Sequence, residues 1–408
     1  MDAPTLFPPS RDAALARLRD FLPKAGADYA RKRNYSLPEQ GHPHVSTLSP
    51  YLRHRMLTEE EVVQATLGRH SASAAEKFVQ EVFWRTYWKG WLERRPQVWT
   101  AYKAGLAQAL NRVQSESGLR RGWEEACAGT TGIDGFDDWA QELVGTGYMH
   151  NHARMWFASI WIFTLRLPWE LGADFFLRHL LDGDPASNTL SWRWVAGLQT
   201  QGKHYVARVA NISKYTEGRH RPLHQLTPQP EPLMGLPHPP LGPVPAPPLP
   251  QGDAPWALLI TEDDLSPGYL RKALAQGPLG TAVINGTGHR SPLATAEPVT
   301  RWAEAAIAET TARYGDWMGR VTHGPEDLVQ WAQDLGARQI VMPYTPVGPA
   351  ADLIAQHRAA LDQAGLPLVP VLRSWDAAAW PHATAGFFKL KSKIPTILAE
   401  LRGLSLAS

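Results

Sequence analysis

A proline-rich stretch divides this chain of 408 residues into two parts with different apolar patterns. Twelve of the 35 prolines fall between Pro222 and Pro250. Because proline lacks a backbone N–H and fixes φ, the stretch is predicted to be extended, without regular helix or sheet. We interpret residues 222–253 as a linker that joins a domain over residues 1–221 to a second domain over residues 254–408. A docking peptide of the PxxP type is the alternative interpretation.

The part before the linker has the residue spacing of helices. Thr58 precedes three glutamates and is predicted to be an N-cap. Residues 74–92 repeat large apolar side chains at helical intervals, and further helices are predicted over residues 137–144, 151–166 and 171–181. No segment alternates apolar and polar residues in the manner of a strand. Residues 1–221 are therefore predicted to form an all-α domain.

The part after the linker alternates short apolar runs with helical segments. The runs, which read as buried strands, cover residues 256–260, 281–284, 339–342 and 366–371. The helical segments between them cover residues 298–314, 325–336 and 350–364. This order predicts an α/β domain with a parallel, doubly wound, Rossmann-like sheet. Because no GxGxxG follows the first strand and no Walker loop is present, nothing in this part specifies a nucleotide.

Composition narrows the class of protein. The single cysteine, Cys127, excludes an internal disulfide and a metal site built from several cysteines, so we expect no metal and a reducing, cytoplasmic location. No apolar run reaches the length of about 18 residues that a membrane span needs, and no secretory signal is visible, so no membrane partner is expected. Residues 1–225 hold 28 Lys and Arg against 23 Asp and Glu. This mild basic bias is typical either of an ordinary solvated surface or of a protein with a polyanionic partner.

A dense polar and aromatic cluster lies within the helical part, between residues 145 and 194. Buried acids, amides and arginines are costly unless they are paired or bind a ligand. Many indoles beside fixed charges favour a site for a large, flat, redox-active ligand. The cluster includes Arg154, Asp182, Asp184, Asn188, Trp192 and Trp194.

Five segments of the helical part resemble, in the same order, motifs of the FAD-binding helical domain of the DNA photolyase/cryptochrome family. They are Val45–Leu52, similar to TSxLSPYL; Phe78–Arg85, similar to (W/F)xxExxWR; Thr146–Met155, similar to TG(W/Y)MHNRxRM; Leu181–Asn188, similar to LxDGDxAxN; and Trp192–Trp194, similar to WQW. Each motif alone is weak, but five in family order are improbable by chance.

The resemblance implies FAD as the cofactor, and it leaves any antenna chromophore unknown. Hydroxyl and backbone N–H groups suit the pyrophosphate, and guanidinium groups balance its negative charge. A neutral amide at the position of Asn188, which faces flavin N5 in the family, favours the fully reduced anionic flavin. The implied cofactor residues are Tyr29, Ser46, Thr47, Leu48, Ser49, Arg85, Asn151, Arg154, Asp182, Asp184 and Asn188.

The resemblance also implies an activity on damaged DNA. The family uses a glutamate and stacking tryptophans to hold an extruded pyrimidine dimer, and these positions carry Glu81, Trp84 and Trp194, with Asn151 and Met155 beside them. The implied enzyme is a lyase that repairs cyclobutane dimers, acting as a monomer, by electron transfer from excited, reduced FAD. The alternatives are a cryptochrome-like blue-light receptor without repair activity and a flavoprotein that only binds a partner.

The chain departs from the family pattern in several places. Trp192 and Trp169 match the first two members of the family's electron-transfer chain, but the distal position is Ala126, and Trp123 is the substitute that we predict, with Tyr148 and Trp161 as alternatives. His152 stands where many relatives have an arginine. The family places its α/β antenna domain first, whereas here the antenna-like part follows the helical part.

Overall fold

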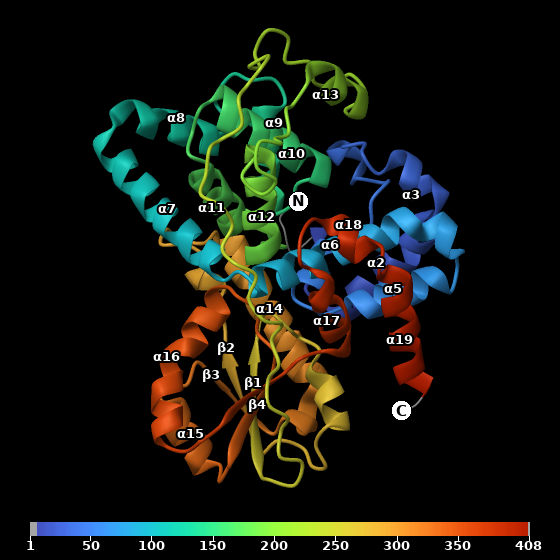
Figure 1. Ribbon diagram of the computed structural model, residues 1–408, viewed down its shortest axis with the longest axis vertical. Coiled ribbons are helices and arrows are strands. Elements are labelled where there is room, and N and C mark those ends of the chain that lie inside the picture. Colours follow the sequence, from blue (N-terminus) through green and yellow to red (C-terminus); the bar gives the residue numbers. More distant parts are fainter. Residues whose placement is uncertain (1–5, 407–408) are drawn as a thin grey trace.

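The computed structural model describes residues 6–406, with helices first and a sheet after them (Figure 1). Residues 6–221 of the described chain contain helices and no strand, as predicted. Their α-helices are α2 (Arg11–Phe21), α3 (Ala27–Lys32), α4 (Ser49–Arg53), α5 (Glu59–Leu67), α6 (Ala72–Glu93), α7 (Gln97–Ser115), α8 (Ser117–Ala128), α9 (Phe136–Thr146), α10 (Asn151–Ser159), α11 (Trp169–His179), α12 (Pro185–Ala196) and α13 (Val209–Tyr215).

Capping residues fix where these helices begin. Thr58 accepts a hydrogen bond from the backbone N–H of Glu61, and the Glu61 carboxylate accepts one from the Thr58 N–H, so the predicted N-cap is confirmed as a complete capping box. The helix predicted over residues 151–166 is interrupted, because a π-helical turn follows α10 over Ile160–Thr164. Such turns widen the backbone locally and often lie near functional sites.

The second part contains a five-stranded parallel sheet in the order β3-β2-β1-β4-β5. The strands are β1 (Trp256–Thr261), β2 (Gly280–Ile284), β3 (Arg320–His323), β4 (Gln339–Pro343) and β5 (Leu368–Val371), and the helices α14 (Glu297–Tyr314), α15 (Leu328–Asp334) and α16 (Pro349–Gln363) connect them. Four strands were predicted. β3 was missed because it is a polar edge strand with no fully buried residue, and thus has no apolar run.

The proline-rich stretch has no helix or strand over residues 222–253, as predicted, but it is not a free tether. The Gly242 N–H donates to the Arg94 carbonyl at 2.8 Å, and the Arg94 side chain donates back to the Gly242 carbonyl at 3.0 Å. The Leu233 N–H donates to the Ala196 carbonyl at 2.9 Å. The stretch therefore runs along the surface of the helical part, to which it is hydrogen-bonded, before it reaches β1 (Figure 1).

The last helices leave the sheet and return to the helical part. They are α17 (Ser374–Ala379), α18 (Phe387–Lys391) and α19 (Ile394–Leu406), and α17 and α18 pack on α6 (Figure 1). Trp375 donates its indole N–H to the Thr86 hydroxyl at 2.8 Å in a buried contact. In the described part of the chain no helix has the length and apolarity to cross a bilayer.

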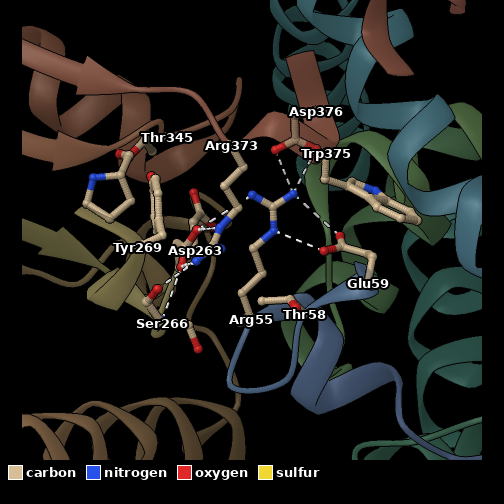
Figure 2. Close-up of polar contacts among 12 residues, drawn as sticks. Arg55, Thr58, Glu59, Asp263, Ser266, Tyr269, Thr345, Arg373, Trp375 and Asp376 are labelled. Atoms are coloured by element: carbon tan, nitrogen blue, oxygen red, sulfur yellow. Dashed lines mark hydrogen bonds and ion pairs between the residues drawn. The ribbon is translucent and has the colours of Figure 1, made fainter. Parts of the chain in front are cut away.

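A buried ionic seam joins the two parts where the sheet ends. Figure 2 shows Arg55 between Glu59 and Asp376, with Arg55–Asp376 distances of 2.7 and 2.9 Å. Arg55 also lies 3.6 Å from Asp264, which follows β1 and accepts two hydrogen bonds from Arg373. Burial opposes ionisation of Asp264, but the Arg373 guanidinium outweighs it and lowers the pKa of that carboxyl. Both cations of the seam are thus matched by carboxylates.

The helical part also fills the crevice beyond β1 and β4, where the strand order changes direction and open α/β sheets bind ligands. Arg53 pairs with Asp263 after β1. Glu93, at the end of α6, accepts hydrogen bonds from the Val347 N–H at 2.5 Å and the Tyr344 hydroxyl at 2.7 Å, both after β4.

Glu93 should make stability fall as pH rises. Burial raises the pKa of Glu93 from 4.5 to about 7. The folded state therefore holds a proton that the unfolded state has released, and this contribution is complete below pH 4.5 and is lost as pH rises through about 7. It amounts to about 3 kcal/mol. We expect Glu93→Gln to flatten the decline in urea midpoint between pH 5 and 8. Because Glu262, whose pKa burial also raises to about 7, is present in both proteins, the difference between them reports on Glu93; parallel curves would contradict this assignment.

Candidate functional site

A cavity of about 630 Å³ opens among α3, α6, α10 and α12 and the turn before α4. Every residue assigned from the sequence to the cofactor or to the DNA lesion lines it. These residues are Tyr29, Ser46, Thr47, Leu48, Ser49, Glu81, Trp84, Arg85, Asn151, Arg154, Met155, Asp182, Asp184, Asn188 and Trp194. Segments up to 165 residues apart in the chain therefore meet at one site.

One wall of the cavity is an acid–guanidinium pair. Asp182, which is buried, accepts hydrogen bonds at 2.9 and 3.0 Å from Arg154. The Arg154 Nε–H donates to the Met149 carbonyl at 2.9 Å, which fixes the guanidinium plane. Burial opposes ionisation of Asp182, yet Arg154 and Arg85 lower its pKa below the ordinary value. Asp182 is therefore an anion that holds Arg154 at the cavity.

The second acid, Asp184, is surrounded by cations. It caps α12, because its carboxylate accepts a hydrogen bond from the Ser187 N–H at 2.7 Å. Its carboxylate also lies 3.5 Å from Lys89, 3.9 Å from Arg53 and 4.0 Å from Arg85. Although burial works against it, this positive surrounding lowers the pKa of Asp184 strongly. Arg53 is also paired with Asp263, but Lys89 and Arg85 share the charge of this one carboxylate, and Arg85 Nη1 has no hydrogen-bond partner, which leaves positive potential for an anionic ligand.

The turn before α4 supplies hydroxyl groups. Ser46 and Ser49 lie at the cavity wall, and Thr47 adopts a positive φ of 48°. The Thr47 hydroxyl accepts a hydrogen bond from Arg17 and donates to the Ser46 carbonyl. The Thr47 hydroxyl is thus engaged within the protein, and the Ser46 hydroxyl accepts a hydrogen bond from the Leu48 N–H at 3.4 Å.

The mouth of the cavity carries the residues predicted to face the lesion. Glu81 pairs with Arg33, and burial raises the pKa of Glu81 in spite of this pairing. Trp84 and Trp194 are half-buried. Trp194 stacks on Tyr205 with ring centroids 5.8 Å apart, which holds its indole in place. One carboxylate and two indoles, each stacked on one neighbouring ring, therefore line this part of the cavity.

The predicted tryptophan chain is only partly connected to the cavity. Trp192 lines it, and its ring centroid lies 6.1 Å from that of Trp161. Trp169 does not line it; its nearest aromatic partner among the described pairs is Tyr102, at 5.8 Å. Trp123, on α8, has no aromatic pair among the described residues.

Unsatisfied buried donors show that the cavity fits FAD. Arg85 Nη1 and the Ser187 hydroxyl are buried without a hydrogen-bond partner, and both residues line the cavity. Such groups are costly unless a ligand meets them. The Asn188 amide N–H donates to the Ala173 carbonyl at 2.8 Å, which fixes its orientation. A pyrophosphate and a polar flavin ring supply the acceptors that these donors lack, and the volume suits a ligand of that size.

Sequence reasoning missed several charged residues of the site. Arg17 binds Thr47, Arg33 binds Glu81, and Lys89 and Arg53 flank Asp184. Arg33 stands in the same segment as Tyr29, and Lys89 lies one helical turn after Arg85 on the cavity side of α6, so their positions gave a signal. Arg17 and Arg53 gave none, because only the tertiary fold brings them to Thr47 and Asp184, which line the cavity.

Comparison with known proteins also indicates an FAD-binding domain. The family profile described as the FAD binding domain of DNA photolyase matches residues 78–220. The deoxyribodipyrimidine photo-lyase of Synechococcus sp. is 32% identical over 195 residues, 46% of this chain and 39% of that protein. That of Thermus thermophilus is 35% identical over 199 residues, 48% of this chain and 45% of that protein. A solved class III photolyase from Agrobacterium tumefaciens is 27% identical, with a TM-score of 0.42 over 50% of this chain and 42% of that chain.

The fold and the cavity define a helical domain that binds a flavin dinucleotide, and its cofactor is FAD. Residues 78–220 of this helical part match the FAD binding domain of DNA photolyase, so the predicted resemblance to the DNA photolyase/cryptochrome family is confirmed. The chain spans less than half the length of the curated relatives that it matches.

Proposed function

We propose that this protein is a photolyase-like lyase that splits cyclobutane pyrimidine dimers in DNA with light. The observation that carries the proposal is that one cavity combines a cationic wall suited to FAD with a mouth made of Glu81, Trp84 and Trp194. Relatives that share the helical part are named deoxyribodipyrimidine photo-lyase. We further propose that it acts as a monomer.

The residues of the chain are proposed to hold the cofactor and to position the extruded dimer beside it. Arg85 and Arg154 balance the negative charge of the cofactor, and Asp182 keeps Arg154 in place. When bound, reduced FAD supplies a light-excited electron donor. The indole faces of Trp84 and Trp194 are proposed to hold the extruded rings, and Glu81 to accept hydrogen bonds from their N–H groups.

The remaining cofactor residues are proposed to keep the roles that the sequence indicated. Tyr29 and the Ser46–Ser49 turn contact the phosphates, and Asn188 faces the flavin ring. Asn151 and Met155 complete the lesion pocket. Trp192, Trp169 and Trp123 are proposed as the electron-transfer route, and Trp192 is its member at the cavity.

We propose a division into a helical domain over residues 1–221, a linker over 222–253 and a doubly wound, antenna-like domain over 254–408. The strand order and the parallel pairing support this assignment. We assign no antenna chromophore to the second domain, since Arg53 and Glu93 occupy the crevice beyond its central strands.

A repair assay tests the proposed function. Purified protein is mixed with DNA that contains thymine dimers, exposed to blue light, and the restored thymines are counted. We expect several turnovers per protein in light and none in the dark. Photoreduction of the flavin without restored thymines would contradict the proposal and favour the light-receptor alternative.

Replacing Glu81 should separate repair from cofactor binding. Loss of a hydrogen bond to a charged group costs about 1.5–3 kcal/mol, so we expect Glu81→Ala to lower the rate of repair about tenfold or more. Glu81→Gln, which keeps one acceptor, should be less affected. The visible flavin spectrum of both variants should match that of the parent. Unchanged repair by Glu81→Ala would contradict the proposed lesion pocket.

A further inference from the structure

The short helix α18 packs on α6, the helix that carries Glu81, Trp84 and Arg85 of the cavity lining (Figure 1). Phe387 of α18 stacks on Trp84, with ring centroids 3.9 Å apart and planes 14° apart. The Tyr87 hydroxyl donates to the Ala385 carbonyl at 2.6 Å, just before α18. At the other end of the helix, Lys391 lies 3.3 Å from Glu76. α18 is therefore fastened along α6 beside Trp84, which itself lines the cavity.

The outer side of α18 exposes an aromatic ring among lysines. Phe388 is 79% exposed and is the one aromatic residue among the exposed large apolar side chains of the described chain. Lys389 and Lys393 are exposed, and neither makes an ion pair within residues 6–406. Lys391, which pairs with Glu76, also places its ammonium 5.9 Å from the ring centre of Phe388.

Folding does not require this exposed ring. Phe387 and Leu390 are buried and supply the apolar contacts that fix α18. Phe388 points away from them and would be more soluble as a polar residue. Basic grooves with exposed aromatic rings are typical of surfaces that bind nucleic acid strands, because bases stack on the rings and phosphates meet the cations.

The positive charge continues on α6, on which α18 packs. Lys77 of α6 is exposed without an ion pair among the described residues, and Arg33, which lines the cavity, is paired with Glu81. The acids of this region, Glu76 and Glu81, are already paired. The region is therefore complementary to a polyanion that passes over the cavity.

We propose that the outer side of α18 binds the DNA that flanks the extruded dimer. Phe388 stacks on a flanking base that has lost its stacking partner because the dimer is extruded. Lys389 and Lys393 contact phosphates. This proposal rests on the proposed function, because it takes the cavity as the place of the dimer. It adds a DNA contact from the part of the chain that follows the sheet.

Fluorescence anisotropy with labelled duplexes tests the proposal, with one duplex carrying a single thymine dimer and a matched one undamaged. We expect Phe388→Ala to weaken binding of the dimer duplex about tenfold, with an unchanged salt dependence. Phe388→Trp should restore it. Lys389→Ala with Lys393→Ala should weaken binding of both duplexes and lower the slope of log affinity against log salt by about 2.

A matched control removes two exposed cations elsewhere. Arg320 and Arg338 lie at the starts of β3 and β4, the end of the sheet opposite the helical part, and their replacement by alanine should leave both affinities unchanged. A retained flavin spectrum shows that each variant is folded.

The outcomes separate this proposal from the proposed function. If all α18 variants bind the dimer duplex like the parent, the α18 proposal is overturned in favour of a surface for another partner, while repair by the parent still supports the lyase. If the α18 variants bind more weakly but repair at the parental rate when DNA is saturating, the proposal is supported. If the parent binds neither duplex, both proposals are overturned.

Discussion

Arg154→Ala is expected to yield a folded protein that purifies without FAD. The guanidinium is held by Asp182 on one side and by the Met149 carbonyl on the other, so it is positioned before a ligand arrives. Its removal takes away a cation from the cavity and leaves Asp182, a buried anion, with Arg85 as its remaining cationic neighbour. Truncating one partner of a hydrogen-bonded charge pair at a binding surface costs about 2–5 kcal/mol, so we expect affinity for FAD to fall about thirtyfold or more.

Absorbance of the purified protein in the flavin bands, followed by titration with FAD, measures this effect. Asp182→Ala should behave in the same way, because it frees Arg154 to move. The matched control is Arg178→Ala, which breaks a similar buried pair with Asp174 on α11, away from the cavity. The control should lose stability and keep FAD. Retention of FAD by both cavity variants would contradict the cofactor site.

Asp376→Ala is expected to be the most destabilising single substitution in the seam between the two parts. Arg55 is 2% exposed and reaches Asp376 at 2.7 and 2.9 Å, so the substitution leaves a buried guanidinium with Glu59 and Asp264 as its remaining partners. Breaking such a group by removing one partner costs about 3–5 kcal/mol. Because the seam joins both parts, we expect one unfolding transition at a lower urea concentration.

An exposed ion pair between the same two parts provides the control. Lys103 of α7 lies 2.7 Å from Asp352 of α16, and both side chains are almost half exposed. Exposed pairs contribute about 0–1 kcal/mol, so Lys103→Ala should barely change the urea midpoint. Equal effects of the two substitutions would show that burial does not decide the strength of these contacts.

The cavity could be predicted from the sequence because its residues come in compact motifs. The pairs Asp182 with Asp184 and Glu81 with Trp84 each lie within one turn or loop, so local spacing carries their chemistry. The helical and α/β parts were likewise evident from periodicity. The edge strand β3 was not, because three of its four residues are polar and none of them is fully buried.

The seam could not be predicted, since its partners are far apart and no local pattern links them. Arg53 and Asp263 are 210 residues apart, and Arg55 and Asp376 are 321 residues apart. In the sequence, Arg53 and Arg55 are typical of a solvated turn. The same reason hid the contact between Trp84 and Phe387, which the fold alone brings together.

The two sides of the seam are synthesised at different times. Arg55 leaves the ribosome 321 residues before Asp376, its counter-ion. At about 5–20 residues per second, this interval lasts roughly 16 to 64 s, during which the nascent turn stays hydrated. Trp302, which donates its indole N–H to the Phe7 carbonyl at 2.6 Å, likewise appears 295 residues after Phe7. The seam therefore closes only after Asp376 has been made, whereas every residue that lines the flavin cavity lies at or before position 195.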